Sequence, residues 1–174
     1  MKFCVSIVVA LLNLFNLLAV EIATAEERLL GDWEITIWQL SKHLESPPEG
    51  RFFNEVNPGI GVRKYLAKKD GVEVFADANY ISKNSTGGKA ILAGIGGQYP
   101  VLSKGHTDLL IGGVAGVMQY ENSWEQKMYV APGAYPFVAS RYKDVTVTVG
   151  YVPHVSIKNK SAYEALFMYV GVRF

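Results

Sequence analysis

Cysteine is almost missing from this sequence, and the single one, Cys4, lies within an apolar run at the N-terminus. Disulfide bonds, thiol catalysis and zinc–thiolate sites are therefore excluded for the rest of the chain. An excess of charge of one sign is missing too, since 17 Lys and Arg residues stand against 16 Asp and Glu residues. Such a balance offers no basic face for nucleic acid. We expect no metal ion, no cofactor and no nucleic-acid partner.

Long apolar runs are scarce, and the one long run lies at residues 3–20, directly after Met1-Lys2. It leads to Ala23-Thr24-Ala25, which has the A-x-A form of a signal-peptide cleavage site. These features predict a cleaved secretory signal peptide over residues 1–25 and a mature chain over residues 26–174. A retained membrane anchor is the alternative, but the run is marginally short and contains two asparagines. No later segment offers the about 18 consecutive apolar residues of a membrane-spanning helix.

The C-terminal stretch, residues 161–174, has a period of two. Large apolar side chains recur at Leu166, Met168, Val170 and Val172, whereas the alternate positions include Ala165, Gly171 and Arg173. This alternation predicts a β-strand with two different faces. Such a strand would aggregate at an exposed edge in water, but it suits a closed barrel whose outer face meets lipid. The last strand of a soluble β-sandwich is the alternative.

Seven other segments are rich in β-branched and aromatic residues or alternate in polarity, and turn-forming residues separate them. With the last strand, the predicted strands are 33–40 (running on to His43), 59–67, 72–81, 90–102, 108–120, 127–140, 145–153 and 161–174. Glycine (17) and tyrosine (10) are abundant as well. We therefore predict an all-β fold, an eight-stranded antiparallel transmembrane β-barrel in the outer membrane of a Gram-negative bacterium.

An even number of strands puts both chain ends on the same side of the barrel, which is the periplasmic side in bacterial outer-membrane barrels. The short turn at Asp70-Gly71, a strong hairpin signal, fits that side. The loops after the first, third, fifth and seventh strands then share the outer rim. His43 and the loop residues 83–85, 121–126 and 154–156 are expected there together, whereas His106 falls in an opposite turn.

Several short motifs follow one another along the chain. They are Phe53-Asn54-Glu55 before Gly59-Ile60-Gly61, then Lys83-Asn84-Ser85, Ala93-Gly94-Ile95-Gly96, residues 135–140, Tyr151-Val152-Pro153 and the aromatic C-terminus. Their order and spacing resemble those of the PagP-type lipid A palmitoyltransferases, over most of the chain from Ser41 onward. The resemblance implies a monomeric outer-membrane barrel that moves an acyl chain from phospholipid to lipid A or another lipid acceptor.

The resemblance also implies catalytic roles for three residues of the outer rim. His43 corresponds to the histidine that acts as general base, and Ser85 corresponds to the catalytic hydroxyl. Asn84 stands where the family has an aspartate. An asparagine cannot accept a proton, but its amide can orient a histidine or stabilise an oxyanion. The alternatives are a polar strand end at His43 and a flexible turn over residues 84–88.

Four further residues are implied for lipid binding. Gly96 would line the acyl pocket, and Pro132, Pro136 and Pro153 would mark the lateral gates through which lipid enters the barrel. Strand prolines also occur at bulges and sheet edges, and glycines relieve crowding in small barrels, so a structural role is the alternative for all four.

A second constellation consists of His154, Ser156 and Glu164. It looks like the H-x-S pair and distant glutamate of the outer-membrane lipid A deacylases, in which the glutamate fixes the tautomer of a histidine that activates serine. An ordinary polar loop is the alternative. A third hypothesis is a non-catalytic barrel that stabilises the membrane or binds a lipid or a surface partner.

Overall fold

The computed structural model describes residues 33–153, 155–157 and 160–174. The predicted signal peptide, residues 1–25, lies outside the described residues, and so does His154. Over the described residues the secondary structure consists of ten β-strands. No helix in this part of the chain is long and apolar enough to cross a membrane.

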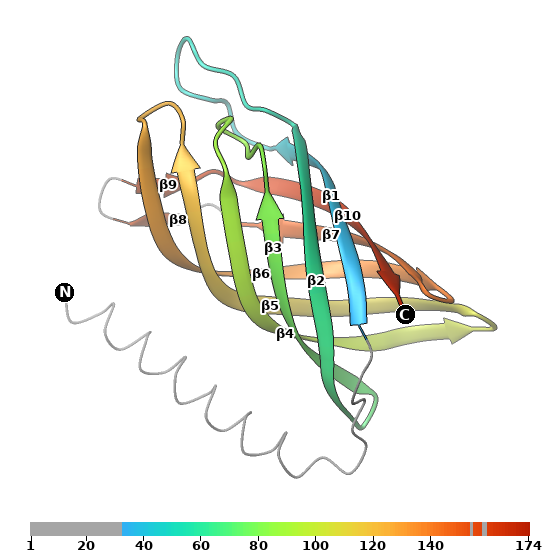
Figure 1. Cartoon of the computed structure of the whole chain (residues 1–174). Coiled ribbons are helices and arrows are strands. Elements are labelled where there is room, and N and C mark those ends of the chain that lie inside the picture. The colour runs from blue at the N-terminus through green and yellow to red at the C-terminus, as the bar shows by residue number, and fades with distance from the viewer. Residues whose placement is uncertain (1–32, 154, 158–159) are drawn as a thin grey trace.

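Eight of the strands close into one antiparallel barrel (Figure 1). Their bounds are β1 Trp33–His43, β2 Val56–Lys69, β3 Val72–Ile81, β4 Ala90–Lys104, β5 Thr107–Asn122, β6 Lys127–Tyr142, β7 Val145–Val152 and β10 Ala165–Arg173. Neighbours in the chain pair with each other, and β10 pairs with both β7 and β1 to close the barrel. The predicted eight-stranded antiparallel barrel is confirmed.

The last barrel strand is shorter than the sequence pattern indicated. We expected a loop over residues 154–160 and a strand from Ser161, but the strand begins at Ala165. Ser161 instead pairs with Ser156 in a separate hairpin of β8 Val155–Ile157 and β9 Lys160–Ala162. A period of two cannot separate a barrel strand from a hairpin strand that precedes it, because both alternate. Four other strands, β2, β4, β5 and β6, run up to three residues beyond their predicted ends.

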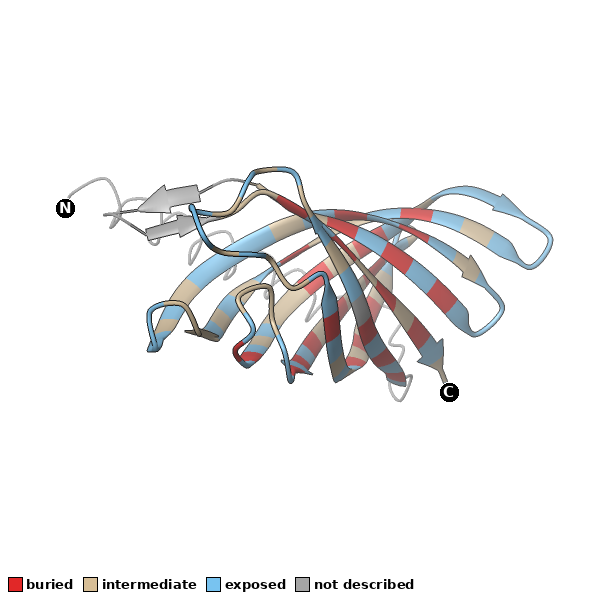
Figure 2. Cartoon of the chain, turned by 90° about the horizontal axis from the view of Figure 1, so that it is seen from above, coloured by how far each residue is buried: buried red, intermediate tan, exposed pale blue. Residues whose placement is uncertain are grey.

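Side chains alternate between the lumen and the outer wall along the barrel strands, so buried and exposed residues follow one another (Figure 2). In β3, the inward set is Glu73, Phe75, Asp77, Asn79 and Ile81, all of them buried. Exposed large apolar side chains of the outward set include Ile35, Ile60, Ile91, Ile111 and Val147. An apolar outer wall around an interior that holds buried charged and polar side chains is the arrangement of a transmembrane barrel.

A bulge in β1 changes which of its residues face inward. Both ladders of β1 shift register between Trp38 and Leu40. Before the bulge, the even-numbered residues of β1 are buried, and beyond it Ser41 and His43 lie opposite buried residues of β10. One extra residue in a strand exchanges the two faces for the rest of that strand. The bulge therefore turns His43 toward the outer mouth of the lumen and Lys42 toward the outer wall.

Buried charges fill the middle of the lumen around Arg63, whose side chain is 1% exposed. Its Nη2 donates to Asp77 Oδ2 over 3.3 Å and to the hydroxyl of Tyr169 over 2.8 Å. Its Nη1 lies 3.6 Å from Glu34 Oε1. A buried guanidinium is tolerated because these carboxylates offset the cost of removing its charge from water.

A second ionic group lies nearer the short turns. Arg141 contacts Glu73 over 2.8 Å and Asp108 over 2.9 Å. Gln98 donates from Nε2 to Glu73 Oε2 over 2.7 Å. Side chains from β3, β4, β5 and β6 thus meet across the lumen and seal it at this level.

Aromatic rings fill the outer half of the lumen. Trp38 stacks on Phe167 and Tyr169 with centroid separations of 5.0 and 4.8 Å. The indole Nε1 of Trp38 donates to Asn79 Oδ1 over 2.7 Å. Tyr135 meets Phe167 edge-on at 4.9 Å. The lumen is therefore an ionic layer beneath an aromatic layer.

Candidate functional site at the outer rim

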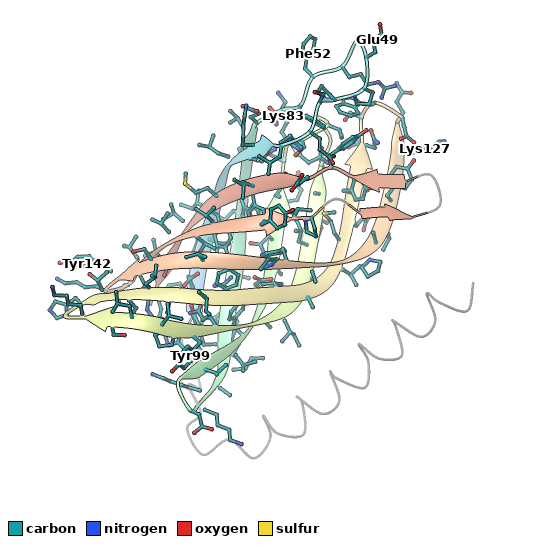
Figure 3. The ribbon with its side chains drawn as sticks, turned by 180° about the vertical axis from the view of Figure 1, so that it is seen from behind. Glu49, Phe52, Lys83, Tyr99, Lys127 and Tyr142 are labelled. Carbon is teal, nitrogen blue, oxygen red and sulfur yellow. The ribbon has the colours of Figure 1, made fainter. Side chains whose placement is uncertain are left out.

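The long connections of the barrel lie together at the end opposite the start of β1 and the end of β10. Figure 3 shows Glu49, Phe52, Lys83 and Lys127 toward this end, and Tyr99 and Tyr142 toward the other. The connections there are residues 44–55, 82–89, 123–126 and 153–164. At the opposite end the turns are tight, with positive φ at Asp70, Gly105 and Lys143. The first set faces outward by the rule for bacterial barrels, and the second faces the periplasm.

His43 lies beneath the first outer loop. Its imidazole stacks on Phe53 with a centroid separation of 3.7 Å and an interplanar angle of 12°. The Nδ1 atom is buried and has no hydrogen-bond partner among the described residues. Burial lowers the pKa of His43 below its usual range, and the carboxylates of Glu55 and Glu45 oppose this shift. The imidazole is therefore held in its neutral form.

Phe53 is the centre of an aromatic cluster that joins three outer loops. Its ring lies 5.4 Å from Trp124 and 5.0 Å from Tyr163. The guanidinium of Arg51 lies 5.3 Å from the centroid of Trp124. This cluster was not predicted from the sequence, although Phe53 belongs to the Phe53-Asn54-Glu55 motif. Aromatic residues in loops follow no periodic pattern, so only that motif could have indicated the cluster.

The side chain of Asn84 forms hydrogen bonds that stabilise its own loop. Its Nδ2 donates to the carbonyls of Lys89 over 3.1 Å and Glu121 over 2.8 Å. Its Oδ1 accepts from Thr86 N and Oγ1 and from Gly88 N, over 2.9, 3.0 and 3.1 Å. The side chain therefore ties the second outer loop to the end of β5. These hydrogen bonds use both amide hydrogens.

Ser85 is linked to the first loop through its backbone. The amide of Asn54 donates to the carbonyl of Ser85 over 2.8 Å. The Asn54 side chain donates to the carbonyls of Val56, Lys83 and Asn84, over 2.5, 3.3 and 3.1 Å. The first and second outer loops are therefore fastened together by Asn54. The structure brings His43 and Ser85 to the same rim, but no hydrogen bond joins their side chains.

Gly96 lies beneath an aromatic ring and not beside an open slot. A Cβ built on Gly96 would lie 2.4 Å from Cζ of Phe75. The guanidinium of Arg63 covers the same ring, 3.7 Å from its centroid. Phe75 thus occupies the space next to Gly96 that an acyl chain would need.

The ladder between β6 and β7 is incomplete, and two of the strand prolines lie where it stops. β6 pairs with β7 only from Phe137–Gly150 to Tyr142–Val145, so residues 127–136 of β6 pair with β5 alone. Pro136 is the first residue beyond this ladder, and Pro132 also lies in the part of β6 that has no partner in β7. An apolar hollow of about 240 Å³ opens on the outer wall here. It is lined by Pro136, Phe137, Val138, Val149, Gly150, Tyr151 and Leu166. We call this place the β6–β7 seam.

Pro153 and Glu164 flank the outer hairpin. Pro153 directly follows β7, where strand pairing ends. Glu164 accepts a hydrogen bond from the hydroxyl of Tyr151 over 2.5 Å, and its backbone amide donates to Glu45 over 3.3 Å. His154 lies outside the described residues, and for Ser156 only the backbone is described. The deacylase assignment therefore stays a prediction.

No group of three or more His, Cys, Asp or Glu side chains in the described part of the chain is placed to hold a metal ion. The outer rim offers a neutral imidazole, hydroxyls and carboxylates.

Comparison of the sequence with protein-family profiles and with curated proteins gave no match. Several solved structures match this chain over most of its length. Neisserial surface protein A has a TM-score of 0.53 and 13% identity, covering 82% of this chain and 94% of that chain. The N-terminal β-barrel domain of Pseudomonas aeruginosa OprF has a TM-score of 0.50 and 10% identity, covering 82% and 97%. The Yersinia pestis outer membrane protein Ail has a TM-score of 0.49 and 8% identity, covering 83% and 99%.

These identities are low, so the likeness shows the fold alone, and the PagP resemblance is supported only to that level. The apolar outer wall of this chain agrees independently with that fold. The chain is an eight-stranded β-barrel of the bacterial outer-membrane type.

Proposed function

We propose that this protein is a non-catalytic outer-membrane barrel that binds a lipid chain at the β6–β7 seam. The observation that carries the proposal is the filled lumen, in which the ring of Phe75 lies over Gly96 and Arg63 covers Phe75. An enzyme that transfers an acyl chain needs an apolar slot for that chain beside its reacting groups. The packing around Gly96 leaves no such slot there.

The seam is suited to lipid because it is apolar and opens on the outer wall. Unpaired backbone donors are costly in hydrocarbon. Pro132 and Pro136 have no N–H, and residues four apart in a strand direct their backbone groups to the same edge. The two prolines therefore reduce the number of unpaired donors along one edge of β6. A lipid chain in the hollow would cover the apolar groups that line it.

The test is lipid retention by the refolded protein in native mass spectrometry. Val149→Trp fills the hollow, and Val147→Trp places the same ring on the same outward face of β7, outside the hollow. We expect bound phospholipid on the wild type and on Val147→Trp, and its loss on Val149→Trp. Equal retention by the two variants would remove the seam from the proposal. Phospholipid turnover by the wild type would remove the non-catalytic part.

Lipid acyl transfer at the outer rim is the second candidate, and His43 is the observation that favours it. A buried, neutral imidazole with an unpartnered Nδ1 has the protonation state of a general base. In this scheme His43 is the base, Ser85 supplies the hydroxyl, and Asn84 orients them or stabilises the oxyanion. The substrates are phospholipid and lipid A.

The second candidate is tested by acyl-transfer assays with detergent-solubilised protein and labelled phospholipid. It predicts transfer to lipid A by the wild type, loss in His43→Ala and Ser85→Ala, and a gain in Asn84→Asp. The non-catalytic proposal predicts no transfer by any of the four proteins. The unaltered lipid A profile of cells that express the protein would agree with the latter.

A further inference from the structure

Lysines occur at both ends of the barrel, and those at the periplasmic end include two that lie against aromatic rings. On the outer wall near the outer rim, Lys42 is neutralised by Glu55, with 2.7 Å between Nζ and Oε1. At the periplasmic end, the segments 64–71, 104–107 and 142–145 carry five lysines and two aspartates. Within the described residues none of these five lysines forms an ion pair. These three segments together therefore carry an excess of positive charge.

Two of these lysines lie against aromatic rings. Trp33 and Lys64 are partners in the β1–β2 ladder, and Nζ of Lys64 lies 5.0 Å from the centroid of the indole. Nζ of Lys143 lies 5.5 Å from the centroid of Tyr142. Trp33 and Tyr142 are both exposed, and both belong to outward-facing sets of their strands. A ring beneath an ammonium group limits where the charge can go, so these amines stay beside the wall.

The height of these pairs relative to the wall identifies what they face. Trp33 is the first residue of β1 and Tyr142 the last of β6, so both lie at the edge of the apolar surface. Aromatic residues at that edge of a membrane barrel lie among the lipid head groups. Lys69, one residue before the tight turn at Asp70, is at the same end and is exposed.

We propose that this periplasmic edge binds the phosphate groups of anionic phospholipids in the inner leaflet, through Lys64, Lys69 and Lys143. An ammonium group donates to phosphate oxygens, and three lysines that form no ion pair with any described carboxylate can each meet a separate phosphate. The excess of positive charge favours lipids with net negative charge over zwitterionic lipids. This surface is at the opposite end from the outer rim, and it does not depend on the proposed function.

The test compares how strongly spin-labelled phosphatidylglycerol and spin-labelled phosphatidylcholine associate with the refolded protein in phosphatidylcholine bilayers. We expect the wild type to prefer phosphatidylglycerol, with the preference weakening as salt is added. Each lysine removed reduces the preference by up to roughly fivefold. The variant Lys64→Gln/Lys69→Gln/Lys143→Gln should have lost it.

Two controls make the result specific. Lys83→Gln/Lys89→Gln/Lys127→Gln removes the same charge from the outer loops and should keep the preference. Lys64→Arg/Lys69→Arg/Lys143→Arg retains charge and ring contact and should keep it as well, which also separates a lost binding site from a misfolded barrel. An absent preference in the wild type, an equal loss in the outer-loop variant, or a loss in the arginine variant would each overturn the proposal.

Discussion

The guanidinium of Arg63 lies 3.7 Å from the ring centroid of Phe75, and this stack occupies the centre of the barrel. Arg63 brings positive charge from β2, and Phe75 brings a ring from β3 that reaches over Gly96 of β4. Three neighbouring strands are therefore fastened by one contact. The same contact fills the place at which the PagP resemblance implied an acyl pocket.

Replacement of Arg63 should destabilise the barrel strongly. Arg63→Ala leaves the carboxylates of Glu34 and Asp77 buried without their cation, and such a loss costs roughly 3–5 kcal/mol. The free energy of unfolding in urea, measured for the refolded protein in detergent, checks this. Lys64→Ala, one residue away and on the outer wall, is the matched control. A loss below about 1 kcal/mol for Arg63→Ala would contradict the assigned ionic layer.

Gly96→Ala should be destabilising because its new methyl group meets Phe75. The added Cβ would lie 2.4 Å from the ring and 2.7 Å from the carbonyl oxygen of Gly113, so β4 or Phe75 must shift, at a cost of about 1–3 kcal/mol. Gly97→Ala is the control, since its Cβ meets nothing closer than 3.9 Å. Urea unfolding of both variants gives the comparison. The double variant Gly96→Ala/Phe75→Leu should recover part of the loss that comes from the ring.

Asn84→Ala should loosen the second outer loop without unfolding the barrel. The substitution removes five hydrogen bonds, four of them to Thr86, Gly88 and Lys89 of the same loop and one to the carbonyl of Glu121 in β5. Amide exchange at Thr86 and Gly88 should accelerate on the order of tenfold, which corresponds to about 1.4 kcal/mol of local stability. Ser85→Ala is the control, because Ser85 takes part through its backbone carbonyl. Unchanged exchange in Asn84→Ala would mean that the side chain does not hold the loop.

Asn84→Asp separates the two functional candidates. The carboxylate cannot donate to the carbonyls of Lys89 and Glu121, so the structure predicts faster amide exchange in this variant also. The acyl-transfer candidate predicts a gain of activity from the same substitution. A gain of activity accompanied by an intact loop would favour the enzyme.

His43 should make the outer rim less stable in mild acid. It lies beyond the ion pair of Lys42 and Glu55, outside the apolar wall, and burial lowers its pKa, while Glu55 and Glu45 act against this shift and Lys42 adds to it. Since the folded pKa is below the unfolded value of about 6.5, the unfolded state binds the proton more readily. The stabilisation is therefore complete above about pH 6.5 and is lost as the pH falls through the folded pKa.

An NMR titration of the His43 ring measures that folded pKa directly. The difference in stability between the wild type and His43→Gln, which does not titrate, should shrink over the same pH range. A ring pKa at or above about 6.5 would contradict the buried, neutral imidazole.

The barrel could be predicted from the sequence because alternation is a local property. The β3 strand from Val72 to Ile81 was predicted with its observed bounds and with its polar face toward the lumen. Strand parity also placed His43 and Ser85 at one rim. Neither inference needs knowledge of any contact between distant residues.

The side-chain contacts of the outer rim could not be predicted from alternation. The stack of Phe53 on His43 and the five hydrogen bonds of Asn84 depend on loop conformations, which have no period. The last strand was predicted too long for a similar reason, because the pairing of Ser161 with Ser156 cannot be deduced from alternation. For Gly96, the sequence indicated small size, but the Phe75 ring that needs it comes from another strand.

The β1 bulge divides one strand into two parts, in which the even-numbered and then the odd-numbered residues face the lumen. Deleting Gln39 would restore an uninterrupted alternation along β1. The residues beyond it that now face the lumen would face outward, and those that face outward would face the lumen. The ammonium group of Lys42 would then point into the barrel beside the aromatic layer, while the imidazole of His43 would turn to the outside of the barrel. A single inserted residue thus decides whether the outer mouth of this barrel holds a titratable ring or a fixed charge.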